Sequence, residues 1–249
     1  MEQYGLIGKP LGHSFSQQYF TEYFARMGRD ACYLSFELDN ITELPALIAA
    51  HPTLRGFNVT IPYKQQVIHY LDHLDEATAA IGAVNVVKIQ REENNSRPLL
   101  LGYNTDHIGF RLSLQALLPG SCRNALLLGT GGASKAVDYA LKELGISTTF
   151  VSRTPTSRQL GYADLSAHTI GDYDIIVNCT PLGMFPAEDT APSIPYEGLH
   201  NRQYCYDLVY NPTQTLFLQR AAQQGCTVCN GLQMLHIQAD ESWKIWNAQ

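Results

Sequence analysis

The chain has few charged side chains and no surplus of positive ones. Lysine and arginine together number 17 and aspartate and glutamate 23 among 249 residues, which leaves a net charge of −6. A nucleic-acid partner would require a basic face to neutralise its phosphates, so we expect none. No apolar run approaches the length that a bilayer crossing requires, and we expect no membrane partner either.

The N-terminal residues 1–5 lack a basic stretch followed by an apolar one, so we expect no secretory signal and a cytoplasmic protein. Six cysteines would form disulfides only in an oxidising compartment, which nothing indicates. Cys226 and Cys229 form a C-x-x-C pair, but the residues between them favour a strand, whereas a redox pair would open a helix. His69 and His73 have helical spacing without any link to that pair. We therefore expect packing cysteines and no metal.

A chain of this length favours two domains over one core. In the first third, short apolar runs alternate with amphipathic segments, which predicts a mostly parallel α/β sheet. A polar stretch over 91–97 between two apolar runs predicts a hairpin at one edge of that sheet. The expected strands are 4–7, 33–38, 56–61, 84–89 and 99–101, and the expected helices lie around 19–27, 44–48 and 67–71.

The middle third has a different pattern. The uninterrupted apolar run 125–128 is typical of a strand buried on both faces, and a glycine-rich turn and a helical stripe ending at Gly145 follow it. We expect a Rossmann-like, doubly wound sheet here, with a cleft between this domain and the first. The further expected elements are strands at 148–151, 174–178 and 204–208 and a last helix over 232–246. The predicted domains are 1–104 plus 231–249, and 105–230, with the crossings at 102–106 and near 230–231.

The turn at 129–134 places glycines between a strand and a helix, as dinucleotide-binding folds do. Gly129 permits a tight turn, and Gly131 lets the backbone approach a pyrophosphate that the helix N-terminus would face. Ser134 stands where a third glycine is usual and is small enough for close helix packing. The alternative interpretation is a purely structural turn.

The end of the second strand of this domain distinguishes the two nicotinamide cofactors. NAD-binding proteins usually place Asp or Glu there to hold the ribose 2′-hydroxyl. This chain has Ser152, Arg153 and Thr154 instead, which offer a planar cation and two hydroxyls to a 2′-phosphate. The sequence therefore predicts NADP, unless Arg153 is an ordinary surface cation.

Lys64 follows the strand-like run 58–61 and Pro62, which cannot continue a strand or a helix. This places it at the mouth of a sheet, where α/β proteins bind ligands. Asp106 stands at the expected domain crossing, directly ahead of a predicted helix. The alternatives are a solvated surface lysine and a helix N-cap aspartate.

Taken together, these segments resemble the shikimate dehydrogenase family along nearly the whole chain. The motifs that carry the resemblance are 8–16, 58–64, 82–85, 104–106, 129–134, 152–154, 178–184, 207–212 and 231–238. The family implies NADPH-linked reduction of 3-dehydroshikimate to shikimate in aromatic amino-acid biosynthesis. Departures are a basic residue displaced to Arg158 and Gln233 where a glycine is common.

The resemblance also implies roles for individual residues. Ser14 and Ser16 would hold the substrate carboxylate with help from Tyr210, while Lys64 would act at the reacting oxygen, with Asp106 to orient it. The ring hydroxyls would be bound by Thr60, Asn85, Asp106 and Gln238. The cofactor would be lined by Gly129, Thr130, Gly131, Gly132, Ala133, Ser152, Arg153, Thr154, Leu208 and Gly231. Met234 would lie near the nicotinamide or, equally, in a helix core.

Two competing hypotheses remain at this point. The first is a broader quinate/shikimate dehydrogenase, against which the paired serines and the missing acid near Arg153 argue. The second is a catalytically silent NADP-binding sensor, which would have no reason to keep both Lys64 and Asp106. The oligomeric state stays open between a monomer and a homodimer.

Overall fold

The structure, a computed structural model, describes residues 1–12, 15–92, 97–118 and 120–248. It divides the chain into two compact units, unit 1 (Met1–Thr105 with Ala239–Gln249) and unit 2 (Asp106–Gln238). The first crossing falls where it was expected. The second lies inside the long helix α8 (Leu232–Asn247) instead of near residue 230, because that helix is continuous across the boundary.

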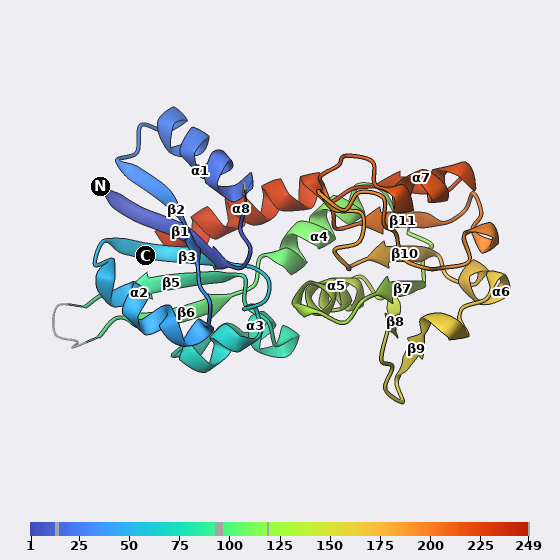
Figure 1. The fold of residues 1–249 in the computed structure, drawn as a ribbon, viewed down its shortest axis with the longest axis horizontal. Helices are drawn as coiled ribbons and strands as arrows, with labels where there is room; N and C mark the ends of the chain where they lie inside the picture. The colour runs from blue at the N-terminus through green and yellow to red at the C-terminus, as the bar shows by residue number, and fades with distance from the viewer. Residues whose placement is uncertain (13–14, 93–96, 119, 249) are drawn as a thin grey trace. The chain divides into compact units, whose positions relative to one another are not determined.

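Unit 1 is built on a six-stranded mixed sheet in the order β2-β1-β3-β5-β6-β4 (Figure 1). β1 is parallel to β2 and β3, whereas β5 is antiparallel to both β3 and β6. The predicted hairpin is therefore confirmed as β5–β6, but it is not at the edge, because the two-residue β4 pairs with β6 outside it. The bounds are β1 (Glu2–Gly8), β2 (Ala31–Glu37), β3 (Leu54–Val59), β4 (His73–Leu74), β5 (Val86–Gln90) and β6 (Leu99–Tyr103).

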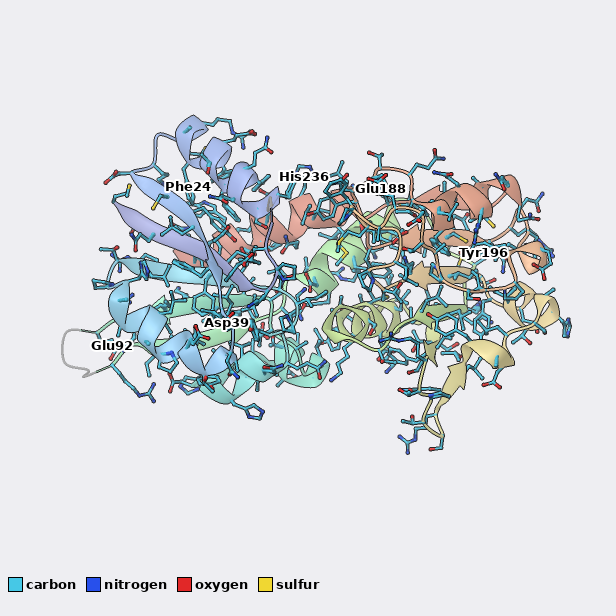
Figure 2. All side chains as sticks on the ribbon, viewed as in Figure 1. Phe24, Asp39, Glu92, Glu188, Tyr196 and His236 are labelled. Carbon is cyan, nitrogen blue, oxygen red and sulfur yellow. The ribbon has the colours of Figure 1, made fainter. Side chains whose placement is uncertain are left out.

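Both faces of this sheet are covered by apolar side chains. Along β1, Tyr4 and Leu6 belong to one buried cluster and Ile7 to the other, as alternation along a strand requires. Phe24 of α1, labelled in Figure 2, belongs to the first cluster, and so does Trp246 of α8. The helices of this unit are α1 (Phe15–Arg26), η1 (Ile41–Glu43), α2 (Leu44–Ala50), η2 (Gln66–Tyr70) and α3 (Glu76–Ile81); η2 is a 3₁₀ helix where the sequence predicted a helix over 67–71.

Unit 2 has an all-parallel sheet in the order β12-β11-β10-β7-β8-β9. This is the doubly wound order, with the strand order reversing between β7 and β10 (Figure 1). Leu126 and Leu128 face one core cluster and Leu127 the other, which confirms a strand buried on both faces. The strands are β7 (Asn124–Leu128), β8 (Ser147–Ser152), β9 (Gln159–Gly161), β10 (Ile175–Asn178), β11 (Tyr204–Asp207) and β12 (Thr227–Cys229). The helices are α4 (Asp106–Gln115), α5 (Gly132–Glu143), η3 (Tyr162–Asp164), α6 (Ala167–Gly171), η4 (Tyr196–Gly198) and α7 (Leu216–Gln223).

The structure shows which elements carry the C-x-x-C pair and the two histidines. Thr227 and Val228 lie in β12, as the strand interpretation predicted, and the six cysteines are free. His69 lies in η2 and His73 in β4, so the i, i+4 spacing of the two histidines does not place them on one helix. Within the described ranges, no cluster of three or more His, Cys, Asp or Glu side chains could hold a metal ion, and no helix has the length and apolarity to cross a bilayer.

Candidate active site

The segments expected to bind substrate meet at one edge of the unit 1 sheet. β1, β3 and β6 point in one direction and β5 in the other, so the carboxyl ends of three strands and the amino end of β5 share an edge. The segments that follow or precede those ends are 8–12, 60–64, 82–85 and 104–105. Strand topology thus brings together motifs that are far apart in the sequence.

Lys64 lies in the turn between β3 and η2 and is half-buried. β3 ends at Val59 and not at Ile61, because the chain turns after Thr60, whose carbonyl accepts a hydrogen bond from the Tyr63 amide (2.9 Å). The Lys64 carbonyl accepts a hydrogen bond from the Val84 amide (2.7 Å). This bond ties the lysine turn to the segment that carries Asn85.

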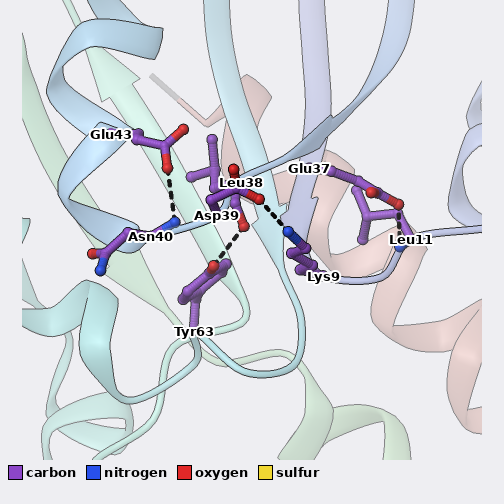
Figure 3. A network of polar contacts seen from close by, with 8 residues as sticks. All are labelled: Lys9, Leu11, Glu37, Leu38, Asp39, Asn40, Glu43 and Tyr63. Atoms are coloured by element: carbon purple, nitrogen blue, oxygen red, sulfur yellow. Dashed lines mark hydrogen bonds and ion pairs between the residues drawn. The ribbon is translucent and has the colours of Figure 1, made fainter.

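Polar contacts around the neighbouring loops hold the same edge in place (Figure 3). The Tyr63 hydroxyl donates to the Leu38 carbonyl at 2.6 Å, and Lys9 forms an ion pair with Asp39. The Leu11 amide donates to a Glu37 carboxylate oxygen at 2.6 Å. These contacts fix the chain that leads from β1 toward α1.

Of the two serines expected to bind the substrate carboxylate, the structure describes only Ser16. Ser14 lies outside the described residues. Ser16 is in the first turn of α1 and is half-buried. Burial raises the pKa of the Tyr33 phenol in β2 well above its ordinary value, and the nearby Ser16 hydroxyl opposes that rise.

Asn85 and the segment 104–106 are hydrogen-bonded to one another. The Thr105 amide donates to Asn85 Oδ1 (2.6 Å), and Asn85 Nδ2 donates to Thr105 Oγ1 (3.0 Å). Asn104 Nδ2 donates to the Ala83 carbonyl (2.8 Å). Asp106 is buried and is the first residue of α4, where the positive end of the helix dipole favours a carboxylate.

In unit 2, the glycine turn lies at the point where the strand order reverses. Gly129 has φ +111°, a conformation that a side chain would rarely adopt, and it directly follows β7. A Cβ at Gly131 would meet no atom within 4 Å, so the backbone there is open to a ligand. Ser134 is buried and its hydroxyl donates to the Gly131 carbonyl (2.7 Å), as expected for close helix packing. The turn, with the amide groups that open α5, fits a pyrophosphate.

Arg153 and Thr154 are exposed at the end of β8, next to Ser152, whose hydroxyl accepts a hydrogen bond from the Thr154 amide (3.2 Å). Burial raises the pKa of Tyr162, and the positive charge of Arg153 opposes that rise. The loop from 153 to 158 contains no acidic residue. The position therefore suits a phosphate and disfavours a ribose 2′-hydroxyl contact of the NAD kind.

Two further residues expected to line the cofactor lie against each other. A Cβ added at Gly231 would stand 2.2 Å from the Leu208 carbonyl oxygen, so no side chain fits there. The Gly231 amide donates to the Val209 carbonyl (3.2 Å). Met234 is buried in a core cluster of unit 2, which agrees with its helix-core alternative.

Tyr210 and Gln238, both expected to contact the substrate, belong to unit 2, as does Asp106. The partners of Ser16, Thr60, Lys64 and Asn85 described above lie within unit 1. Burial raises the pKa of Tyr210, so its phenol keeps its proton under ordinary conditions.

Sequence reasoning assigned no role to a buried polar pair at the carboxyl ends of β10 and β11. Asn178 Nδ2 donates to Asp207 Oδ1 (2.9 Å), and the Thr215 hydroxyl donates to Asp207 Oδ2 (2.6 Å). Burial raises the pKa of Asp207 to about 6, against the opposing effect of these hydrogen bonds. The only signal in the sequence is a polar residue at the end of each apolar strand.

The doubly wound sheet, the glycine turn at its switch point and the cation after its second strand define an NADP-binding α/β oxidoreductase. Comparison with known proteins agrees with this class. Residues 6–87 match the family model described as the shikimate dehydrogenase substrate binding domain.

Two curated relatives carry the name shikimate dehydrogenase (NADP(+)). The protein of Methanococcus aeolicus is 36% identical over 97% of this chain and 90% of its own length, and that of Pyrococcus abyssi is 35% identical over 99% and 92%. The crystal structure of Thermus thermophilus shikimate 5-dehydrogenase in complex with NADP(H) and shikimate has a TM-score of 0.85 at 30% identity, covering 99% of this chain and 94% of that one. The chain belongs to the shikimate dehydrogenase family.

Proposed function

We propose that this protein catalyses the reversible, NADPH-dependent reduction of 3-dehydroshikimate to shikimate, a step of aromatic amino-acid biosynthesis. The observation that supports this most directly is the convergence of the Lys64, Asn85 and Thr105 segments at one edge of the unit 1 sheet. Relatives similar over almost the whole chain are named for this NADP-linked activity.

Unit 2 would bind the cofactor. The glycine turn would hold the pyrophosphate, Arg153 with Ser152 and Thr154 the 2′-phosphate, and Leu208 and Gly231 the nicotinamide side. The open backbone at Gly131 and the absence of an acid beside Arg153 support these roles. Bound NADPH supplies a hydride to the ketone carbon of the substrate.

Unit 1 would hold most of the substrate. Ser14 and Ser16, with Tyr210, would bind its carboxylate, while Thr60, Asn85 and Gln238 would bind its hydroxyls. Negative charge develops on the ketone oxygen during the reduction, so a proton donor must stand within hydrogen-bond reach. The Lys64 ammonium would donate that proton, and the Asp106 carboxylate would orient the ammonium and accept a bond from a neighbouring hydroxyl.

The experiment that tests this function is a steady-state comparison of shikimate and quinate, each with NADP and with NAD. We expect the highest kcat/KM for shikimate with NADP. Comparable values for quinate would favour a broader quinate/shikimate dehydrogenase. NADP binding without turnover of either substrate would favour the silent sensor.

A further inference from the structure

A continuous chain of buried polar side chains runs through unit 1. Its members are Tyr33, Asn58, Asn85, Thr105 and Ser242, each between 0 and 5% exposed. They come from five separate parts of the chain: β2, β3, the segment before β5, the segment before α4, and α8. Serine is a poor helix former, and Ser242 is fully buried within a helix, so its presence there calls for a partner.

The orientation of the Asn58 side-chain amide is fixed by the Asn85 backbone carbonyl, which can only accept a hydrogen bond. Its Nδ2 donates to the Asn85 backbone carbonyl (3.2 Å) and also to Ser242 Oγ (3.0 Å). Asn58 Oδ1 therefore faces Tyr33, whose hydroxyl donates to it (2.7 Å). A flipped amide would place its oxygen against the Asn85 carbonyl and lose that bond, because a carbonyl cannot donate.

The orientation of the Asn85 side-chain amide is fixed by the Thr105 backbone amide, which can only donate a hydrogen bond. The Thr105 amide donates to Asn85 Oδ1, so Asn85 Nδ2 must be the atom facing Thr105 Oγ1. The hydroxyls of Thr105 and Ser242 lie 3.4 Å apart and close the circuit. The network therefore reaches from Tyr33 of β2 to the residue before Asp106.

A network of buried hydrogen bonds is not needed to make a core stable, because apolar side chains of the same shape can contribute as much. Replacing both partners of a buried hydrogen bond with apolar groups of the same shape is often nearly neutral, whereas removing one partner costs about 1–3 kcal/mol. A fully bonded polar network instead specifies one arrangement of the elements that it joins. Here it joins β2, β3 and α8 to the two segments that carry Asn85 and Asp106.

We propose that Tyr33, Asn58 and Ser242 are positioning residues for the substrate. They fix the Asn85 backbone and the Thr105 segment that leads into Asp106, and Thr105 in turn orients the Asn85 side-chain amide. This inference rests on the proposed function, because Asn85 and Asp106 matter only if they bind the substrate. Tyr33 acts through Asn58, and Ser242 acts both through Asn58 and directly on the Thr105 hydroxyl. Their effect therefore belongs to the use of shikimate and not to the binding of NADP by unit 2.

The test compares Tyr33→Phe and Ser242→Ala with the wild-type enzyme. The rate of the reaction falls steeply when the substrate is held slightly out of position. We therefore expect kcat/KM for shikimate to fall about 5- to 100-fold in each variant. The dissociation constant for NADP should stay within about twofold. In the double variant the loss should be smaller than the product of the single losses, because both act through one amide.

Tyr206→Phe is the matched control. It removes an equally buried phenol hydroxyl, bonded to Ser113 Oγ at 2.8 Å, but in unit 2 and outside the network. It should lower stability without changing kcat/KM for shikimate. An unchanged kcat/KM in both network variants, an equal loss in Tyr206→Phe, or a parallel loss of NADP affinity would each overturn the inference. A wild-type enzyme without shikimate turnover would instead overturn the proposed function.

Discussion

At the scale of single residues, the proposed chemistry depends most on Lys64 and Asp106. Lys64→Ala should lower kcat by about 10²–10⁴, the usual span for general acid–base catalysis, with the fold intact by circular dichroism. Asp106→Asn should also be severe, because it removes the charge that orients the ammonium. If the two act as a unit, the double variant should be little worse than the poorer single one.

Lys244→Ala serves as the control for loss of a lysine, since Lys244 is exposed and pairs only with the neighbouring Glu241 (2.6 Å) in the described part of the chain. It should retain normal turnover. Fully multiplicative losses for Lys64 and Asp106 would mean that Asp106 is a substrate ligand alone. Near-normal turnover by Lys64→Ala would exclude the mechanism.

Arg153 should decide the choice of cofactor. Arg153→Ala should weaken NADP about 10-fold or more, because a hydrogen bond to a charged group contributes about 1.5–3 kcal/mol. NAD should be almost unaffected, since only NADP carries the 2′-phosphate. Titration of each variant with NADP and with NAD measures this. Arg158→Ala, which removes a second arginine from the same exposed loop, is the comparison variant. An equal loss of NAD affinity would make Arg153 a general ribose or adenine contact.

Asp207 should make stability depend on pH. Its pKa in the folded protein is about 6, above the ordinary 3.8, so folding favours the protonated carboxyl. Its contribution to the free energy of unfolding is therefore full below about pH 4 and is lost as the pH rises through 6, by about 3 kcal/mol in total. Asp207→Asn has no such titration. In denaturant unfolding, the free energy of unfolding of the wild type minus that of Asp207→Asn should decrease between pH 4 and 7. A constant difference would contradict the assignment.

At the scale of elements, sequence patterns predicted most of the longer strands and helices and missed several short ones, among them β4 and β9. The buried run 125–128 and the stripe of α5 are periodic signals that need no knowledge of their neighbours. β4 and β9 contain only 2 and 3 residues, too few for a period, and exist because another strand pairs with them. The strand-like run 58–61 begins with a polar residue, yet Asn58 is buried, because Tyr33 and Ser242 bond to it from distant segments.

The helix α8 should stabilise unit 1 chiefly through Trp246. Its indole lies 4.9 Å from the Tyr4 ring and its N–H donates to the Val87 carbonyl (3.0 Å). Trp246→Ala should lower the free energy of unfolding by about 3–5 kcal/mol, as large-to-small changes in a core do. Trp246→Phe keeps an aromatic ring and should cost clearly less. Equal losses in denaturant unfolding would show that the indole N–H, and not the packing, carries the effect.

At the scale of the whole molecule, the sequence predicted two domains and the first crossing between them, but not the second. Asn230 and Gly231 have the composition of a linker. In the structure Asn230 Nδ2 donates to the Thr213 carbonyl (2.9 Å) and its Oδ1 accepts from the Leu232 amide (3.1 Å), so this segment belongs to unit 2. The helix that follows continues into unit 1. Composition cannot reveal this, because the bond from Asn230 to Thr213 joins segments that are distant in the sequence.

The two ligands should therefore protect different units from hydrogen exchange. A ligand at about 100 times its dissociation constant stabilises the state that binds it by about 2.7 kcal/mol, which slows exchange through openings that release the ligand about 100-fold. NADP alone should protect peptides that cover 129–135 and 152–154, and shikimate alone those that cover 60–64 and 84–85. Arg153→Ala should reduce the first effect at a fixed NADP concentration and leave the second unchanged. Protection of 60–64 by NADP without shikimate, or of 129–135 by shikimate without NADP, would mean that the two binding functions are not divided between the units in this way.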